Sequence, residues 1–262
     1  MKQRFDLLLR GGTVATPNGI APADIGVIGG RIAAIGSFSD APAAEMFEAR
    51  GLHVLPGVMD TQVHFREPGN AHKEDLASDS LAAILGGVTS VFEMPNTNPP
   101  TTTRAAIEDK LVRAKGRMHC DHAFYAGATP QNIGALAELE RMPGVQTLVT
   151  ILLDHVSKGD LTLERFVDLT SAGPQRIFGI AGKGRIARGY DADFTIVDLG
   201  LTREIQNSWI ASTCGWTPFD GMKTKGWPVA TILRGTVVMR DFAAVGAARG
   251  APMRFVDTLE PQ

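Results

Sequence analysis

The sequence is poor in cysteine and lacks long apolar runs. Its two cysteines, Cys120 and Cys214, lie far apart and form no Cys-x-x-Cys pair. This excludes a disulfide framework and a paired-thiolate metal site, and indicates free thiols in a reducing compartment. No apolar stretch approaches the ~18–20 residues that a membrane-spanning helix needs, and the first residues, MKQRFDLLLRGG, contain no signal-peptide hydrophobic region. We therefore expect a cytoplasmic protein.

Blocks of charge of one sign are also missing. The chain has 26 Lys and Arg against 28 Asp and Glu, and the basic residues are scattered. Neither nucleic acid nor a membrane surface is therefore expected as a partner. Hydrophobic residues make up 44% of the 262 positions and charged residues 21%, a composition typical of a globular protein with a sizeable core.

Both ends of the chain have the pattern of β-strands. Short β-rich runs with glycine turns occupy the first 50 residues, and the same texture returns in the last third, in DADFTIVDLG, TREIQNSWIAS and WPVATILRGTVVMRD. LLRGGTV (Leu8–Val14) is echoed by ILRGTVV (Ile232–Val238). A β layer built jointly by the two ends would explain this echo.

Strands and helices alternate between these ends. LHVLPGVMD, GVTSVFEMP and HCDHAFYAGA read as buried strands, and HKEDLASDSLAAIL, TTTRAAIEDKLVRAKG and PQNIGALAELER as the helices that follow them. Apolar strands alternating with helices predict parallel β/α units.

The alternation stops after Gly144. VQTLVTILLDHVSKG and LTLERFVDLTSAGPQRIF predict two consecutive helices without a strand between them. The region from Val54 to Ile180 holds 127 residues, whereas a closed eight-stranded barrel takes about 250. We expect an incomplete barrel of about three β/α units whose edge strands are unpaired and whose inner face is partly uncovered. Such edges favour a homo-oligomer.

Two motifs follow the first two buried strands. DTQVHFREPG places Asp60, Gln62, His64 and Arg66 at alternating positions, and MPNTNP places Asn96 after the second strand. With LPGVMD before the first motif, HKED after it, and the closing segments GIAGKGRIARGYDADFTIVD and STCGWTPFDGMKTKGWPVATILRG, the chain resembles the dihydroorotase branch of the amidohydrolase superfamily, the cyclic-amide hydrolases.

The resemblance implies a (β/α)8 barrel with a small β-sandwich built from both termini. It also implies one or two zinc ions at the carboxyl ends of the barrel strands. Zinc lowers the pKa of bound water to about 7 and polarises the ring carbonyl, and a carboxylate carries the proton to the leaving nitrogen. The expected substrate is a cyclic ureide, with dihydroorotate, hydantoins and allantoin left open.

The family pattern transfers to this chain only in part. His64 matches the second histidine of a His-x-His metal pair, and Gln62 occupies the position of its partner. Arg66 and Asn96 match the residues that contact the substrate carboxylate, work that suits a bidentate guanidinium. Asp60 is expected to support the metal ligands rather than to bind metal.

Several other family residues have no counterpart here. The family carries its bridging lysine, two later metal histidines and a general-base aspartate between two similar segments, and Met142-Pro143-Gly144 joins those segments directly in this chain. His119 and His122 flank the third strand and are interpreted as structural, as are Asp191 and Asp193 in GYDADF.

Three hypotheses follow from the sequence. The first is hydrolysis of dihydroorotate, a step of pyrimidine biosynthesis. The second is a non-catalytic homologue that acts as a scaffold or partner subunit. The third is the product of an internal deletion, or an ordinary full-length relative whose middle is missing from this sequence. We expect activity of this chain to be absent or at trace level. The predicted domains are residues 1–53 and 183–262, which form the sandwich, and 54–182, which form the partial barrel.

Overall fold

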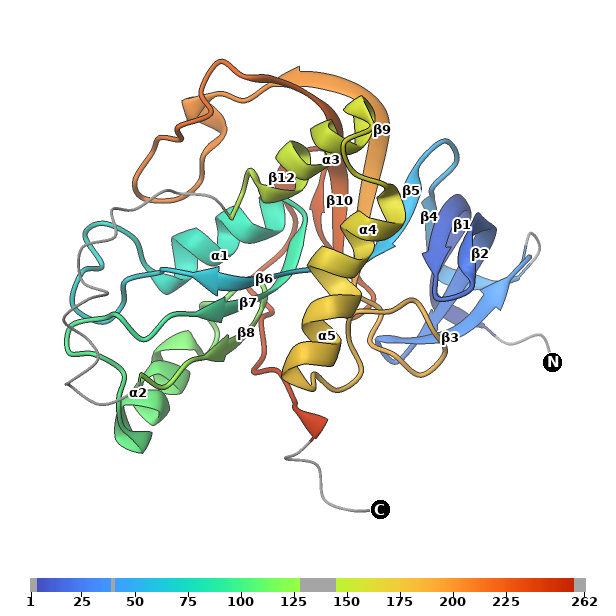
Figure 1. The fold of residues 1–262 in the computed structure, drawn as a ribbon. Coiled ribbons are helices and arrows are strands. Elements are labelled where there is room, and N and C mark those ends of the chain that lie inside the picture. Colours follow the sequence, from blue (N-terminus) through green and yellow to red (C-terminus); the bar gives the residue numbers. More distant parts are fainter. Residues whose placement is uncertain (1–3, 39–40, 128–144, 257–262) are drawn as a thin grey trace.

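The computed structural model describes residues 4–38, 41–127 and 145–256, which form two sheets and a group of helices (Figure 1). The strands of the larger sheet are β1 (Phe5–Thr16), β2 (Gly19–Ile28), β3 (Arg31–Gly36), β4 (Ala43–Glu48), β5 (His53–Pro56), β9 (Phe194–Glu204), β10 (Lys223–Leu233), β11 (Thr236–Arg240) and β12 (Ala243–Ala244). The smaller sheet contains β6 (Val58–Val63), β7 (Val88–Glu93) and β8 (Asp121–Phe124). The fold class is α/β, as expected.

Both ends of the chain contribute to the larger sheet. Its order is β12-β11-β10-β9-β5-β1-β2-β3, with β4 paired to β1, and β5 joins the two halves through antiparallel pairing with β9. The echo segments lie within β1 and across the β10–β11 hairpin. The predicted joint β layer is therefore present, as one mixed sheet over an apolar core that includes Leu9, Ile25 and Ile196.

The predicted strand LHVLPGVMD is two strands in two different sheets. The chain leaves the larger sheet after β5 and enters the smaller sheet at β6, with Gly57 between them. A Cβ at Gly57 would lie 2.4 Å from Oγ1 of Thr89, so the crossing requires a residue without a side chain. An unbroken apolar pattern cannot reveal such a change of sheet.

The smaller sheet is parallel and its strands are connected by helices. α1 (Leu76–Leu85) joins β6 to β7, and α2 (Arg104–Ala114) joins β7 to β8. α1 begins four residues later than HKEDLASDSLAAIL predicts, because Asp75 is its N-cap and accepts hydrogen bonds from the backbone of Ala77 and Ser78, each 2.8 Å long. The buried face of α1 packs against β7.

Helices follow one another in the next described part of the chain, as predicted. They are α3 (Leu148–Lys158), α4 (Leu163–Val167), the π-helical turn η2 (Asp168–Ala172) and α5 (Gly173–Phe178). α3 lies against β10, where the Thr150 hydroxyl donates to the carbonyl oxygen of Gly226 at 2.9 Å. The predicted helix PQNIGALAELER and the Met142-Pro143-Gly144 junction lie outside the described residues.

Two further expectations are corrected. The strand predicted over TREIQNSWIAS ends at Glu204, and the 3-10 turn η3 (Asn207–Trp209) follows in an irregular segment. The edge of β8 is also not unpaired, since the C-terminal segment pairs with it at His122 and Pro252.

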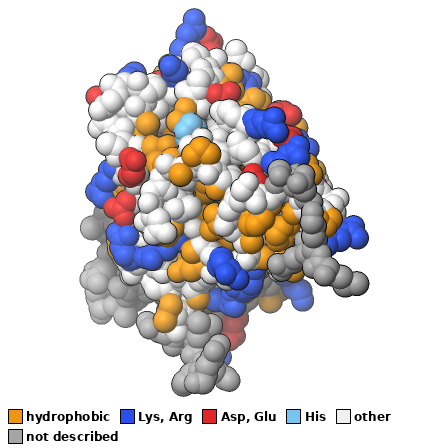
Figure 2. All heavy atoms as spheres, turned by 90° about the vertical axis from the view of Figure 1, so that its right-hand side faces the viewer, with side chains coloured by type: hydrophobic (Ala, Val, Ile, Leu, Met, Phe, Trp, Pro, Cys, Tyr) orange, Lys and Arg blue, Asp and Glu red, His pale blue; other side chains and the backbone are white. Residues whose placement is uncertain are grey.

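Among the described residues, no helix is long and apolar enough to cross a membrane. Basic side chains are dispersed over the face shown in Figure 2.

Candidate functional site

The carboxyl end of β6 carries the first motif. β6 ends at Val63, and its pairing with β7 is irregular between Asp60 and Val63. The backbone N–H of Gln62 donates to Oδ1 of Asp60 at 3.0 Å, and the Gln62 side chain is exposed. Arg66 has a φ of 61°, in the left-handed region. Side chains alternate between the two faces of a sheet only while the backbone stays extended, and the backbone is no longer extended at Arg66. The even spacing of Gln62 and Arg66 therefore does not place their side chains on the same face.

His64 and Asn96, which sequence analysis assigned to different roles, lie in contact. Nδ1 of His64 lies 2.9 Å from Oδ1 of Asn96, and both side chains are half-buried. With the amide oxygen as acceptor, Nδ1 carries a proton and donates a hydrogen bond to Asn96. The parallel strands β6 and β7 bring the two residues together, because both motifs follow carboxyl ends at one edge of the sheet.

The two motif loops are also joined through their backbones. The N–H of Asn98 donates to the carbonyl oxygen of Pro68 at 3.0 Å. Gly69 lies against this contact with a φ of 99°, and a Cβ there would sit 2.0 Å from the Asn98 carbonyl oxygen. The guanidinium of Arg117 also binds the first loop, donating hydrogen bonds of 2.7 and 2.9 Å to the buried Glu67 carboxylate. These contacts fix the positions of the two loops that carry His64 and Asn96.

A buried ion pair lies beneath these loops. Glu93, the last residue of β7, pairs with Lys110 of α2, and neither side chain has exposed surface. Burial raises the pKa of Glu93 to about 7, against the opposing charges of Lys110 and Arg66. Burial also lowers the pKa of Lys110. Sequence reasoning missed this pair, although an acidic residue closing the apolar run SVFE was the available signal.

Tyr125, the residue directly after β8, links the third strand of the smaller sheet to the other two. Its backbone N–H donates to the carbonyl oxygen of Glu93 at 3.0 Å, and its hydroxyl donates to the carbonyl oxygen of Thr61 at 3.1 Å. The ends of β6, β7 and β8 are therefore linked. At this linked edge the His64 imidazole meets the Asn96 amide, and both groups can hydrogen-bond a planar polar ring. The charge of Arg66 lies near enough to Glu93 to lower the pKa of that carboxyl.

The donor set of the described residues does not fit a zinc centre. Within residues 4–38, 41–127 and 145–256, no group of three or more His, Cys, Asp or Glu side chains could hold a metal ion. All six histidines of the chain belong to these ranges, and His64 already contacts an amide. Zinc sites use three or four such ligands.

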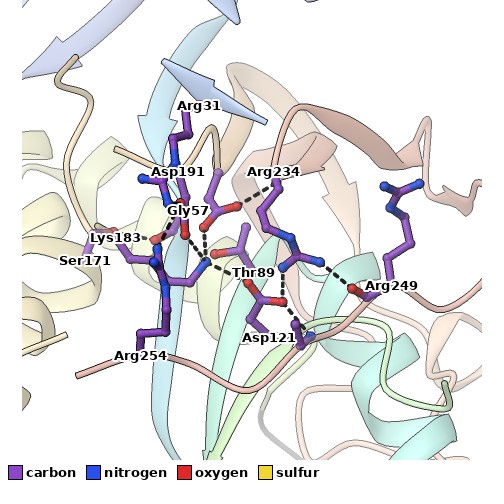
Figure 3. Close-up of polar contacts among 12 residues, drawn as sticks. Arg31, Gly57, Thr89, Asp121, Ser171, Lys183, Asp191, Arg234, Arg249 and Arg254 are labelled. Carbon is purple, nitrogen blue, oxygen red and sulfur yellow. Dashed lines mark hydrogen bonds and ion pairs between the residues drawn. The ribbon is translucent and has the colours of Figure 1, made fainter. Parts of the chain in front are cut away.

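A second polar cluster lies at the opposite end of β8 (Figure 3). Nζ of Lys183 lies 2.7 Å from Asp121, 2.5 Å from Asp193 and 3.3 Å from Asp191, and all four side chains are buried. Burial alone would lower the pKa of Lys183, but the three carboxylates raise it. Asp121 also binds the guanidinium of Arg234. The expected structural role of Asp191 and Asp193 agrees with this placement, away from His64 and Asn96.

Two family comparisons bear on the identity of the chain. The model of the amidohydrolase family matches residues 114–238, and the model of the dihydro-orotase-like family matches residues 51–141. Each match spans less than half of the chain, and together they support the amidohydrolase superfamily. Within it, the allantoinase of Rubrobacter xylanophilus is 45% identical over 136 residues, and that of Deinococcus radiodurans is 42% identical over 136 residues. Each match covers 52% of this chain and 30% of the relative, so these relatives are about 450 residues long.

The chain shares its fold with solved structures of hydantoinases. The L-hydantoinase of Arthrobacter aurescens superposes with a TM-score of 0.86 at 21% identity, covering 95% of this chain and 99% of that chain. The dihydropyrimidinase of Brevibacillus agri NCHU1002 gives 0.79 at 18% identity, covering 97% and 99%. The expected superfamily is supported by the two family matches. The dihydroorotase branch stays a prediction, because these relatives are named allantoinase, hydantoinase and dihydropyrimidinase.

Proposed function

We propose that this amidohydrolase-superfamily chain binds a cyclic ureide and does not hydrolyse it by itself. The observation that carries the proposal is the contact of His64 with Asn96, at the position where a hydrolase of this family would need a cluster of metal ligands. Among the described residues no such cluster exists. Arg66 and Asn96, the expected substrate contacts, remain at the ends of β6 and β7.

The chemistry of the site supports a ureide ring as ligand. A ureide carries carbonyl oxygens and N–H groups in one plane, which match guanidinium donors and an imidazole acceptor. The names of the curated relatives favour allantoin, whereas an arginine with an asparagine favours a ring that carries a carboxylate, such as dihydroorotate. The proposed ligand class is therefore the five- or six-membered cyclic ureide.

The loss of catalysis would follow from an incomplete barrel. The smaller sheet has three parallel strands in the described residues, and the next described part of the chain, from residue 145, contains helices α3 to α5. The relatives are about 450 residues long against 262 here. We propose an internal deletion at Met142-Pro143-Gly144, with 1–53 and 183–262 forming a β-sandwich around a partial barrel at 54–182. A cytoplasmic homo-oligomer completes the proposal.

The second candidate is a working cyclic-amide hydrolase with zinc. Identities of 42–45% to allantoinases favour it. The two candidates differ in one respect that can be measured: a hydrolase turns the ureide over in the presence of zinc, whereas a binding protein returns it unchanged.

The deciding experiment measures binding and turnover on the same samples. Allantoin, hydantoin and dihydroorotate are titrated by calorimetry, and ring opening is followed by NMR with and without zinc. We expect one ureide to bind without ring opening. Arg66→Lys should weaken that binding about tenfold, because a point charge replaces a bidentate donor. Arg104→Lys, at a side chain 93% exposed on α2, is the matched control and should bind normally.

Two results would contradict the proposal. Zinc-dependent ring opening that His64→Ala abolishes would establish the hydrolase instead. Failure of all three ureides to bind would leave the scaffold hypothesis, in which the retained motif residues serve only the fold.

A further inference from the structure

The segment Arg249–Val256, here named the C-terminal strap, runs along the edge of β8. The N–H of His122 donates to the carbonyl oxygen of Ala251 at 3.0 Å, and the N–H of Met253 donates to the carbonyl oxygen of His122 at 2.8 Å. Gly250 adds a bond of 2.7 Å from its N–H to Met118. This is the hydrogen-bonding pattern of a neighbouring parallel strand, reduced to a single bridge.

The strap is paired on its other side as well. The N–H of Ala181 donates to the carbonyl oxygen of Arg254 at 2.9 Å, and the N–H of Val256 donates to that of Gly179 at 2.7 Å. In Figure 1 the red C-terminal segment descends between β8 and α5. The strap therefore fills the space between the last strand of the smaller sheet and the segment that follows α5.

Side chains of the strap cover one face of the smaller sheet. Met253 is 7% exposed and packs in a cluster with Phe92 of β7 and Ile180. The ring of Phe255 lies 6.1 Å from that of Phe92, edge to face. Without the strap, part of this apolar cluster would face water.

The buried charge cluster anchors the strap at its start. Oδ1 of Asp121 accepts a hydrogen bond from the N–H of Ala251 at 2.8 Å, and Arg234 binds both Asp121 and the carbonyl oxygen of Arg249 (Figure 3). Gly250 allows the close approach, because a Cβ there would lie 2.0 Å from the carbonyl oxygen of Cys120. Asp121 is thus shared between Lys183 and the strap.

We propose that the C-terminal strap is a substitute edge strand, which keeps the edge of β8 from pairing with a second copy of this chain. Without a neighbouring strand, the N–H and C=O groups along the edge of β8 would have no hydrogen-bond partners. An unpaired edge of this kind can pair with a strand of another chain. The strap supplies those partners within one chain. This role is independent of ureide binding.

The test is Gly250→Ala in the full chain. Hydrogen exchange at the Met253 amide reports whether the strap leaves β8, and light scattering over a concentration series reports association. We expect exchange at Met253 at least tenfold faster and a weight-average mass that rises with concentration above that of the unmodified chain. A peptide with the sequence of residues 249–256, added in excess, should reverse the rise. Gly200→Ala, whose nearest contact would be Asp198 at 3.3 Å, is the control.

Each other result overturns the proposal. A Met253 amide as protected as in the unmodified chain would show that the approach at Gly250 does not hold the strap. A released strap with unchanged mass would show that it does not guard the edge. If Gly250→Ala loses its far-UV circular dichroism, Met253→Ser decides by the same two measurements, because it weakens the apolar contact without a backbone clash.

Discussion

Lys110 of α2 and Glu93 of β7 form an ion pair that has no contact with solvent. Lys110 also donates to the carbonyl oxygen of Met94 at 3.3 Å, and its ammonium group lies 5.4 Å from the centre of the Phe124 ring. Oε1 of Glu93 has no hydrogen-bond partner in the part of the chain that the structure describes. The pair therefore fixes α2 beneath the candidate site while leaving one buried oxygen unsatisfied.

Removal of one partner of this pair should be strongly destabilising. Lys110→Met leaves the Glu93 carboxyl buried without its counter-charge, and such changes cost about 3–5 kcal/mol. We expect that loss in the free energy of unfolding, measured by urea denaturation. The double variant Lys110→Met with Glu93→Gln should recover part of it. The exposed pair Arg104–Glu108 is the comparison, where Arg104→Ala should change stability by under about 1 kcal/mol. Equal losses at the two sites would contradict the prediction.

The stability of the protein should depend on pH through Asp60. Burial raises the pKa of Asp60 from 3.8 to about 6. The folded chain therefore holds the proton more tightly than the unfolded chain. The resulting stabilisation is present below pH 3.8 and is lost as the pH rises through 6. Between pH 4 and 7, the unfolding free energy of the unmodified chain should fall relative to Asp60→Asn by on the order of 1–3 kcal/mol. Parallel pH profiles of the two proteins would refute this.

Gly69→Ala should separate the two motif loops. The new methyl group would meet the carbonyl oxygen of Asn98 at 2.0 Å, in a backbone conformation with a φ of 99°. We expect a loss of more than about 2 kcal/mol, together with a changed tautomer signature of His64 in nitrogen-15 NMR. Gly51→Ala has a φ of 77° with nothing within 4 Å, so it should cost only the backbone strain of about 1 kcal/mol. An unchanged His64 signal in Gly69→Ala would contradict the coupling.

Chelation should leave the protein unchanged. Because no metal-ligand cluster exists in the described ranges, EDTA should shift the melting temperature by less than about 1 °C. Zinc content after dialysis should be far below one ion per chain. If zinc raised the melting temperature by several degrees, and His64→Ala removed that rise, the protein would have a zinc site and the prediction would be wrong.

Local pattern in the sequence was enough to predict the class of the fold. The strand-rich ends, the β/α alternation from β6 to β8 and the consecutive helices α3 to α5 all follow from the spacing of apolar residues. The motifs HFREPG and MPNTNP indicated the amidohydrolase superfamily, which the family matches support. Adjacency of parallel strands also placed both motifs at one edge of a sheet, where His64 and Asn96 meet. These features depend on neighbours within about thirty residues.

Only the tertiary structure decided which distant groups meet. Lys183 forms an ion pair with Asp121, which lies 62 positions earlier in the chain. The N–H of Ala251 donates a hydrogen bond to Asp121 across 130 positions. The strap and the break at Gly57 are invisible to periodicity, because both depend on which sheet edge lies next to the chain. A sequence states what each segment prefers locally. Which buried charge finds its partner, and which strand edge is covered, is settled when the whole chain excludes water around them.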